Sequence, residues 1–302
     1  MSREHRRFGI TGNDIAGYLL ISPWLIGFAV FTLVPLVSSF LYSLTSYNLL
    51  SAPEFVGISN YLQAFEDDRF YQSFRVTFTY ALVHVPLKLV FALFVAMLFN
   101  CDRKGVGIYR ALYYLPSIIG GSIAVSVMWI QMFGSAGAFN SILGKIGIET
   151  TTNWIKNPKT SLAAVIILAV WQFGSPMLIF LAGLKQIPRT YYEAAEIDGA
   201  GAARRFMSIT LPSLTPVIFF NLVMQLISAF MAFTQAYIIS GGAGGPSDTT
   251  LFYALYIYLQ GFRYGRMGYA CALAWIIIVL IAIVTAVLFK TSGRWVFYGE
   301  DE

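Results

Sequence analysis

The sequence predicts an all-α polytopic membrane protein with six transmembrane helices, and three observations support this. Of the 302 residues, 57% are hydrophobic and only 12% are charged, and the mean hydropathy is +0.67. Soluble domains carry about 25% charged residues, so a globular fold of this length would lack the polar residues to cover its surface. Six stretches are long and apolar enough to cross a bilayer, and none shows the alternating pattern of barrel strands.

Each transmembrane helix needs about 20 mostly apolar residues. The first stretch follows a basic N-terminal segment and runs well beyond the about 7–15 apolar residues of a signal peptide, so we expect a retained span. No low-complexity linker divides the chain, and we expect one membrane domain over residues 1–302. The predicted spans cover approximately residues 16–43, 72–99, 108–133, 161–184, 208–238 and 267–290.

The distribution of basic residues predicts the orientation. With the N-terminus in the cytoplasm, twelve of the 20 Lys and Arg residues lie on the cytoplasmic side, and Lys88 lies within the second span. This bias favours both termini inside and accounts for the net charge of +5 without nucleic-acid binding, which no basic stripe supports. The cytoplasmic set is Arg3, Arg6, Arg7, Arg103, Lys104, Arg110, Lys185, Arg189, Arg204, Arg205, Lys290 and Arg294.

The cytoplasmic loop at 185–207 holds a dense block of charged and small residues. Thr190 is expected to cap a helix, because Glu193 follows at the capping-box spacing. Gly199 and Gly201 are expected to break that helix, since glycine adopts a positive φ without penalty. The pattern predicts a helix–turn–helix outside the membrane whose small residues let another protein approach closely. An ordinary amphipathic connector between two spans is the alternative.

The same loop carries a signature: Glu-Ala-Ala, three residues, Gly, nine residues, Ile, one residue and Leu-Pro. All seven fixed positions are present, as Glu193, Ala194, Ala195, Gly199, Ile209, Leu211 and Pro212. On these residues the chain resembles the permeases of binding-protein-dependent ABC importers. The resemblance implies a coupling helix before Gly199 that sits in a cleft of a separate ATPase. The residues expected to couple are Tyr192, Glu193, Ala194, Ala195, Asp198, Gly199, Ala200, Arg204, Ile209, Leu211 and Pro212. Pro212 is expected in the first turn of span five, where its missing N–H costs nothing.

Further segments resemble the sugar permeases of the maltose and glycerol-phosphate type, and Pro23 and Pro35 favour the first permease of a pair. A longer glycine-rich stretch at 241–243 departs from that pattern. The resemblance implies the type I importer permease fold in the cytoplasmic (inner) membrane of a bacterium or archaeon. The segments are Phe55–Tyr61, Leu115-Pro116, Trp171-Gln172, Leu181–Leu184, Gly244–Pro246 and Gly268–Ala270.

The resemblance also implies the partners. They are a second permease, expected to be a different chain, two ATPase subunits, an extracytoplasmic solute-binding protein and membrane lipid. ATP and Mg would be bound by the ATPases, so this chain is expected to bind no cofactor. The sequence agrees, because it lacks a P-loop and the HExxH and GxSxG motifs, and its two cysteines form no metal-ligand pattern. We therefore expect a permease subunit rather than an enzyme.

Polar residues in span five share one helical face. They either line a translocation path, where amides bind sugar hydroxyls, or form hydrogen bonds between helices. The residues are Asn221, Gln225, Ser228 and Gln235.

Two other spans carry candidates for the path. Lys88 lies four residues after His84 in span two, and a snorkelling side chain is the alternative for this lysine. Trp171 and Gln172 in span four combine an aromatic face with an amide, a pair suited to a sugar ring and its hydroxyls.

The sequence therefore predicts a subunit of an ATP-driven importer for a sugar or oligosaccharide, working by alternating access. A permease for an amino acid, peptide or polyamine is the first alternative, because substrate residues are weakly marked in sequence. A secondary transporter and a membrane enzyme are further alternatives, opposed respectively by the loop signature and by the absence of a catalytic constellation.

Overall fold

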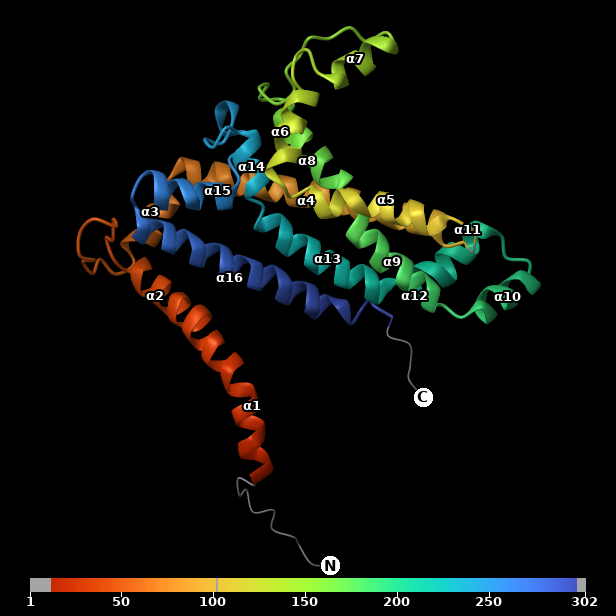
Figure 1. The fold of residues 1–302 in the computed structure, drawn as a ribbon, viewed down its shortest axis with the longest axis horizontal. Coiled ribbons are helices and arrows are strands. Elements are labelled where there is room, and N and C mark those ends of the chain that lie inside the picture. The colour runs from red at the N-terminus through yellow and green to blue at the C-terminus, as the bar shows by residue number, and fades with distance from the viewer. Residues whose placement is uncertain (1–11, 102, 298–302) are drawn as a thin grey trace, which may run out of the picture.

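The computed structural model describes residues 12–101 and 103–297. Within these residues the fold is helical throughout, and the only β contact is one isolated bridge between Thr45 and Phe55. Figure 1 shows an elongated helical bundle from which an N-terminal helix, a hairpin around α7 and a pair of helices around α10 project. The all-α prediction is confirmed. Arg3, Arg6 and Arg7, used above for orientation, lie outside the described residues.

Four helical segments are long and apolar enough to cross a membrane without a sharp bend: Gly17–Ser43, Asp68–Phe99, Thr215–Ile239 and Met267–Ser292. Two further spans are pairs of shorter helices, and counting each pair as one gives the six predicted spans. The helices that form these spans are α1 (Gly12–Phe28), the π-helix η1 (Ala29–Leu33), α2 (Val34–Ser43), α4 (Asp68–Phe99), α5 (Val106–Ile119), α6 (Ile123–Met132), α8 (Ser161–Trp171), α9 (Gly174–Gln186), α13 (Thr215–Phe230), α14 (Thr234–Ile239) and α16 (Met267–Ser292).

Short helices fill the loops between the spans. On the side predicted to be external, these are α3 (Ser59–Glu66), α7 (Ala138–Lys145), the 3₁₀ turn η3 (Pro246–Asp248), α15 (Tyr253–Tyr258) and the π-helix η4 (Leu259–Arg263). At the other end are α10 (Arg189–Ile197), α11 (Ala202–Arg205), the π-helix η2 (Phe206–Thr210) and α12 (Leu211–Ser213).

The third span is a sharply bent pair rather than the continuous helix expected over 108–133. Its two halves, α5 and α6, meet at an angle of 98°. The chain turns at Gly120 and Gly121, and the hydroxyl of Ser122 caps α6 by accepting the N–H of Val125 at 3.3 Å. A Cβ on Gly120 would lie 2.4 Å from the side chain of Gln172, so glycine permits this close approach.

The fourth span bends by 42° between α8 and α9. The break frees backbone groups, and Ser117 of α5 satisfies two of them. Its hydroxyl donates to the carbonyl oxygen of Gln172 at 3.0 Å and accepts the N–H of Ser175 at 3.1 Å. A neighbouring helix thus replaces the hydrogen bonds that a continuous helix would form within the membrane.

Helix α4 forms the centre of the bundle, packed against α8, α9, α13 and α15. Its buried face carries Tyr80, Val85 and Ala92 at helical spacing. Small residues such as Ala92 and Ala96 let the neighbouring helices approach closely, as is usual in membrane bundles. This central helix therefore determines which side chains of the surrounding spans face one another.

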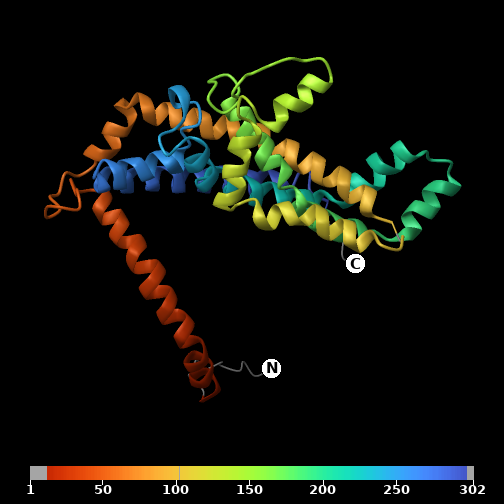
Figure 2. The ribbon, with the colours of Figure 1, turned by 45° about the horizontal axis from the view of Figure 1, so that its top comes forward.

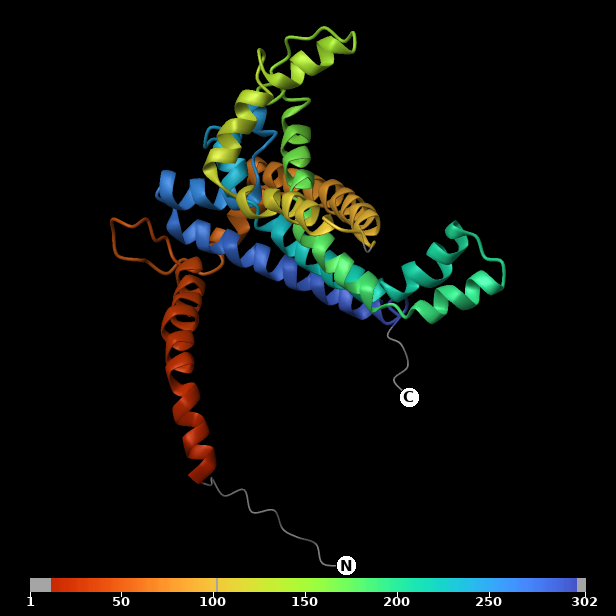
Figure 3. The ribbon, with the colours of Figure 1, turned by 45° about the vertical axis from the view of Figure 1, so that its right-hand side comes forward.

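The N-terminal helices leave this bundle, as Figures 2 and 3 show. Only the end of α2 is anchored, where the indole N–H of Trp275 in α16 donates to the hydroxyl of Ser39 at 3.1 Å. The most apolar window of Gly17–Ser43 is 0% buried, compared with 33% for α4. Beyond the contact of α2 with α16, the described residues leave the apolar surface of this segment exposed, so it must be covered by lipid or by another subunit.

The close packing of α2 against α16 predicts that Gly268 cannot be replaced by a residue with a Cβ without a loss of stability. Its N–H donates to the carbonyl of Tyr47 at 2.9 Å, and a Cβ there would lie 2.1 Å from the carbonyl oxygen of Thr45. Gly268→Ala should therefore push α2 away from α16 and cost about 1–3 kcal/mol of stability. Thermal unfolding in detergent measures this, with Gly144→Ala as the control because its Cβ meets nothing within 4 Å. Equal melting temperatures for both variants would contradict the prediction.

Candidate functional site

A polar cavity of about 230 Å³ lies where the interrupted spans meet α4. Each interrupted span contributes to its wall close to its own break. Complete small-molecule pockets are about 300–1,000 Å³ in volume, so this cavity is the size of part of a site. It is lined by Tyr80, His84, Lys88, Gly121, Ala169, Gln172, Gln225, Ser228, Ala232, Phe233, Thr234 and Gln235.

The helix breaks build this cavity. Gln235 of α14 donates from Nε2 to the carbonyl oxygen of Gly120 at 2.9 Å, which ties span five to the turn in span three. Gln172, at the end of α8, donates to the carbonyl oxygen of Leu168 at 3.1 Å. Irregular backbone is tolerated at membrane depth where it is buried in protein or lines a water-filled cavity. The arrangement of the three breaks is therefore the geometry of a solute path.

The structure brings five of the seven predicted path residues together: Lys88, Gln172, Gln225, Ser228 and Gln235 all line this cavity. Asn221 does not line it. Its side chain is only 1% exposed and donates to the carbonyl oxygen of Val217 at 3.0 Å. Gln225, Ser228 and Gln235 of span five therefore line one cavity, whereas Asn221, nearer the start of the span, is covered by packing.

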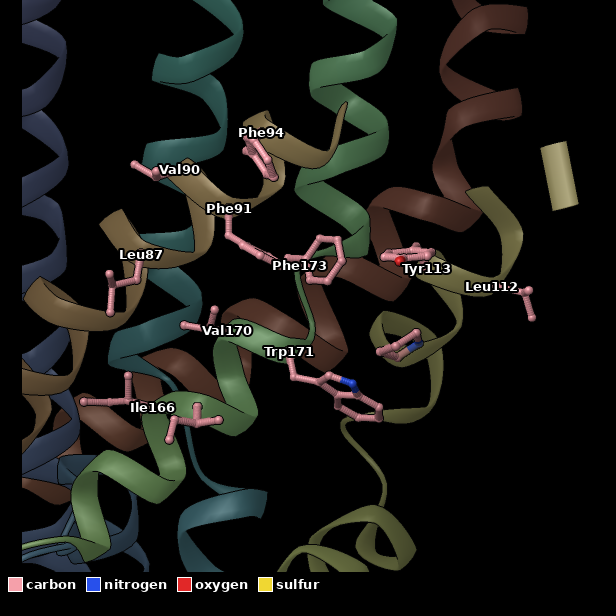
Figure 4. Close-up of a pocket in the computed structure, with 12 residues that line it drawn as sticks. Leu87, Val90, Phe91, Phe94, Leu112, Tyr113, Ile166, Val170, Trp171 and Phe173 are labelled. Atoms are coloured by element: carbon pink, nitrogen blue, oxygen red, sulfur yellow. The ribbon is translucent and has the colours of Figure 1, made fainter. Parts of the chain in front are cut away.

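Trp171 lies in a different hollow, an apolar groove of about 870 Å³ between α4, α5 and α8. Figure 4 shows its indole among aliphatic and phenyl side chains, including Phe91 and Phe173. Tyr113 supplies the only hydroxyl among the lining side chains. A sugar needs many hydrogen bonds, so this groove suits lipid or an apolar helix. The expected pairing of Trp171 with Gln172 at one site is not formed, since the two side chains face different hollows.

Tyr80 is a cavity residue that sequence reasoning missed. It stacks on His84 with ring centroids 4.5 Å apart, and Lys88 follows one turn later on the same face of α4. The Nδ1 atom of His84 is buried and has no hydrogen-bond partner within the part of the chain that the structure describes. The spacing of these three residues by four could have revealed the stripe.

The loop at 185–207 forms the predicted helix–turn–helix, which projects beyond the bundle as α10 and α11 (Figures 1 and 3). Gly199 has φ of +72°, as expected for the break. Gly201 has an ordinary φ of −68° and precedes α11. The predicted capping box is wrong, because α10 begins at Arg189 after Pro188 and places Thr190 inside the first turn.

The residues of α10 divide into an exposed and an anchored set. Glu193, Ala194, Asp198 and Arg204 are exposed, and the side chain of Ile197 is 88% exposed. Ile197 is the last residue of α10, so its exposed side chain lies at the turn of the projecting loop.

Two contacts anchor this loop to the bundle and to itself. The hydroxyls of Tyr192 and Thr210 lie 2.8 Å apart, which joins α10 to the start of span five. Arg205 forms an ion pair with Glu196 at 3.2 Å across the turn. Of the other expected coupling residues, Ala195, Ala200, Ile209, Leu211 and Pro212 are half-buried and Gly199 is exposed.

The expected position of Pro212 in the first turn of span five is wrong. The chain is already helical through α11 and η2, so Pro212 lies inside a continuous helical run. The π-helix η2 accommodates it, with the N–H of Leu211 donating to the carbonyl of Phe206 five residues earlier. A wider turn before the proline removes the clash that an α-helical backbone would impose. The backbone is therefore helical from Ala202 to Ser213, just before span five begins at Thr215.

A polar clasp at the opposite end joins segments far apart in sequence. Arg69 binds Asp248 through two hydrogen bonds of 2.9 Å, which fixes the glycine-rich loop against α4. The carboxylate of Asp67 accepts hydrogen bonds from the hydroxyls of Tyr256 and Tyr269. No local pattern could have revealed these pairs, because their members are separated by about 180–200 residues.

The chain is an interrupted helical bundle with a polar cavity and a projecting loop, and several of its helices are long and apolar enough to cross a membrane. Residues 68–296 match the family described as the binding-protein-dependent transport system inner membrane component. The chain is 54% identical to the probable ABC transporter permease protein YesP of Bacillus subtilis, over 97% of this chain and 95% of that protein. It therefore belongs to this family of inner-membrane permease components, and a permease subunit of this family is not an enzyme.

More distant relatives have named cargoes. The arabinooligosaccharides transport system permease protein AraP of Bacillus subtilis is 33% identical over 94% of this chain and 90% of its own. The trehalose/maltose transport system permease protein MalF of Thermococcus litoralis is 34% identical over 92% and 94%. A crystal structure of a bacterial alginate ABC transporter superposes with a TM-score of 0.79 at 21% identity, over 93% of this chain and 95% of that one. That likeness confirms the importer permease fold.

The external clasp predicts a stability that depends on pH. Burial opposes ionisation of Asp67, but hydrogen bonds from Tyr256, Tyr269 and backbone N–H groups outweigh it and hold the pKa of Asp67 below its usual value of 3.8. A lowered pKa in the folded state means that the stabilisation is complete above the unfolded-state pKa. It is lost as the pH falls through the folded-state pKa.

We expect Asp67→Asn to melt at a lower temperature than the wild type at neutral pH, because the amide loses the charge-assisted hydrogen bonds. Between about pH 5 and about pH 3 the wild type should lose stability more steeply than the variant, which lacks the titrating group. Thermal unfolding in detergent across this range measures both effects, and Glu66→Gln, a neighbouring exposed carboxylate, is the control. Parallel pH curves for wild type and Asp67→Asn would show that the clasp does not contribute.

Proposed function

We propose that this chain is the transmembrane subunit of an ATP-driven ABC importer for a sugar or oligosaccharide. The observation that carries the proposal is the membrane-embedded cavity lined by Gln172, Gln225 and Ser228. Amides and hydroxyls both donate and accept hydrogen bonds, which is what a solute covered in hydroxyl groups requires. The relatives whose printed names mention arabinooligosaccharides and trehalose/maltose support the same class of solute.

A permease for another small solute is less well supported by this cavity. No carboxylate lines it, so a polyamine or the ammonium group of an amino acid would find no counter-charge.

The projecting loop favours an importer driven by separate ATPase subunits over a secondary transporter. A secondary transporter has no ATPase subunits, so an exposed helix that ends in the apolar Ile197 would have no partner to bind.

A second permease subunit, expected to be a different chain, would complete the path. The apolar faces of α1 and α2 and the groove around Phe91 are left uncovered by this chain. Both surfaces are suited to helices of a neighbour within the bilayer, with lipid covering what remains. A first permease of such a pair would reach its partner through the N-terminal helix that leaves the bundle in Figure 2.

Two ATPase subunits, which would bind ATP and Mg, are proposed to dock at α10. When the ATPases close on ATP, α10 would move with them and pull on span five through the contact between Tyr192 and Thr210. An extracytoplasmic binding protein would deliver solute to the external helices. Alternating access then follows from rocking one membrane subunit against the other, with the cavity exposed to each side in turn.

Coupling through α10 predicts the effect of two substitutions. Glu193→Ala removes an exposed carboxylate proposed to meet a basic residue in the ATPase cleft, and losing one partner of such a pair costs about 2–5 kcal/mol. Gly199→Ala forces a side chain into the left-handed region, at about 1–2 kcal/mol, and redirects α11. Both variants should insert normally but lose solute uptake and co-purify less ATPase. Uptake and pull-down of the assembled complex measure this.

Two control substitutions distinguish a loss of ATPase docking from a general folding defect. Gly201→Ala places the same methyl group two residues away at an ordinary φ and in open space, so it should keep transport. Glu149→Ala removes an exposed carboxylate at the other end of the molecule. If Glu193→Ala and Gly199→Ala bind ATPase and transport at wild-type rates, α10–α11 is only a connector.

The basic-residue bias predicts an orientation with both termini and α10 in the cytoplasm. In a variant with Cys101 and Cys271 replaced by serine, Lys145→Cys should react with an impermeant thiol reagent added to intact cells. Arg204→Cys should react only after the membrane is permeabilised. Labelling of Arg204→Cys in intact cells would invert the proposed topology.

A further inference from the structure

A lysine without an acidic partner lies in the membrane-embedded cavity. Lys88 lines the cavity beside His84 and Gln225, and its side chain forms no ion pair or hydrogen bond within residues 12–101 and 103–297. None of the residues lining the cavity is an aspartate or a glutamate. The lysine is half-buried, so its ammonium group is only partly hydrated.

This chain cannot supply the missing counter-charge at that depth. The sequence contains no Asp or Glu between residues 69 and 101, 103 and 148, 150 and 192, or 199 and 247. Its carboxylates are confined to the loops and helix ends, where Asp67 and Asp248 already have hydrogen-bonded partners. An ionised amine within a bilayer is retained where it faces a water-filled cavity or meets an anion. The anion must therefore come from the solute or from another subunit.

A second basic cavity adjoins the first along the same two helices. It has a volume of about 280 Å³ and lies toward the end of α4 that carries the clasp. Arg75 and Lys159 line it, and neither side chain forms an ion pair or hydrogen bond within the described part of the chain. Helix α4 contributes Thr79 to this outer cavity and Tyr80 to the inner one.

Both cavities are lined by basic residues and by residues of α4 and α8. Helix α8 repeats the pattern of α4, with Leu162 in the outer wall and Ala169, two turns later, in the inner wall. No carboxylate lines either cavity. Arg75 and Lys159 are exposed, and cations without carboxylate partners attract anions and raise their local concentration. By contrast, Arg69, nearby on α4, is neutralised by two hydrogen bonds to Asp248.

We propose that the imported sugar is anionic, and that Lys88 binds its negative group. The proposal rests on the proposed function and specifies its substrate class. The amides of Gln172 and Gln225 bind the hydroxyls, while Arg75 and Lys159 attract the anion to the outer mouth of the path. The negative group is a carboxylate, as in a uronic acid, or a phosphate ester, since an ammonium group binds both.

The test uses the whole complex, with its ATPases, second permease and binding protein, in proteoliposomes. The probe is a mixture of neutral disaccharides and trisaccharides, their uronic-acid counterparts and sugar phosphates, and mass spectrometry identifies what enters on ATP addition. We expect uptake from the acidic fractions, and the fraction that enters distinguishes carboxylate from phosphate. Uptake of neutral sugars alone would overturn the anion proposal and leave the sugar importer intact. If no sugar enters, both proposals fail.

Substitutions of Lys88 test whether its positive charge is responsible for the uptake of acidic sugars. Lys88→Met should lower acidic-sugar uptake by about tenfold or more, the effect of losing one hydrogen bond to a charged group. Lys88→Arg should retain most of the uptake, because the positive charge is kept. Gln225→Leu should lower uptake of every sugar that enters, since it removes a hydroxyl contact rather than a charge. Lys145→Met, on an exposed external helix, is the control for loss of a lysine elsewhere.

A purely structural lysine gives a different pattern. If Lys88→Met reduces co-purification of the second permease, the lysine pairs with a carboxylate of that subunit and the proposal is overturned. An equal loss of neutral and acidic uptake would also overturn it. Normal assembly with a selective loss of acidic-sugar uptake, rescued by Lys88→Arg, is the result that the proposal requires.

Discussion

The requirement that every backbone N–H and C=O be satisfied within a bilayer governs this structure. Spans three and four break their own helices, and side chains of neighbouring helices satisfy three of the freed backbone groups. Ser117 bridges the break in span four, and Gln235 binds the carbonyl of Gly120 at the turn of span three. These bonds hold the breaks against α4, and the hollow left between them is the polar cavity. Without the breaks, the residues that line the cavity would be packed between continuous helices.

The polar cavity and the larger apolar groove therefore have different origins and different linings. The cavity around Gln225 forms where backbone is irregular and polar side chains are needed. The larger groove around Phe91 forms between regular helices whose facing side chains are apolar. Volume alone would select the groove as the site. The chemistry of the lining selects the smaller cavity, because a hydrated solute crossing the membrane must exchange its water for hydrogen bonds from the protein.

The cytoplasmic and external ends of the bundle are built for different tasks. The external clasp joins α4, η3, α15 and α16 through charged and hydroxyl groups, so that end is held together by many long-range contacts. The contacts of the α10–α11 loop include the hydroxyl contact of Tyr192 with Thr210 and the ion pair of Arg205 with Glu196. The helical backbone of this loop continues from α11 to α12, and a turn at Leu214 separates it from span five, which begins at Thr215.

The sequence by itself determined the class of protein, the number of spans and the identity of the projecting loop. These properties depend on local composition and spacing: apolar runs of span length, basic residues near span ends and seven signature residues around Gly199. Five of the seven residues predicted for the path line one cavity in the structure, because the polar face of span five is visible at helical spacing, and their role in transport stays a prediction. Only the tertiary structure separated Trp171 from Gln172, buried Asn221 and joined Arg69 to Asp248. Those outcomes depend on which helices meet, and helix contacts between residues far apart in the chain leave no trace in local periodicity.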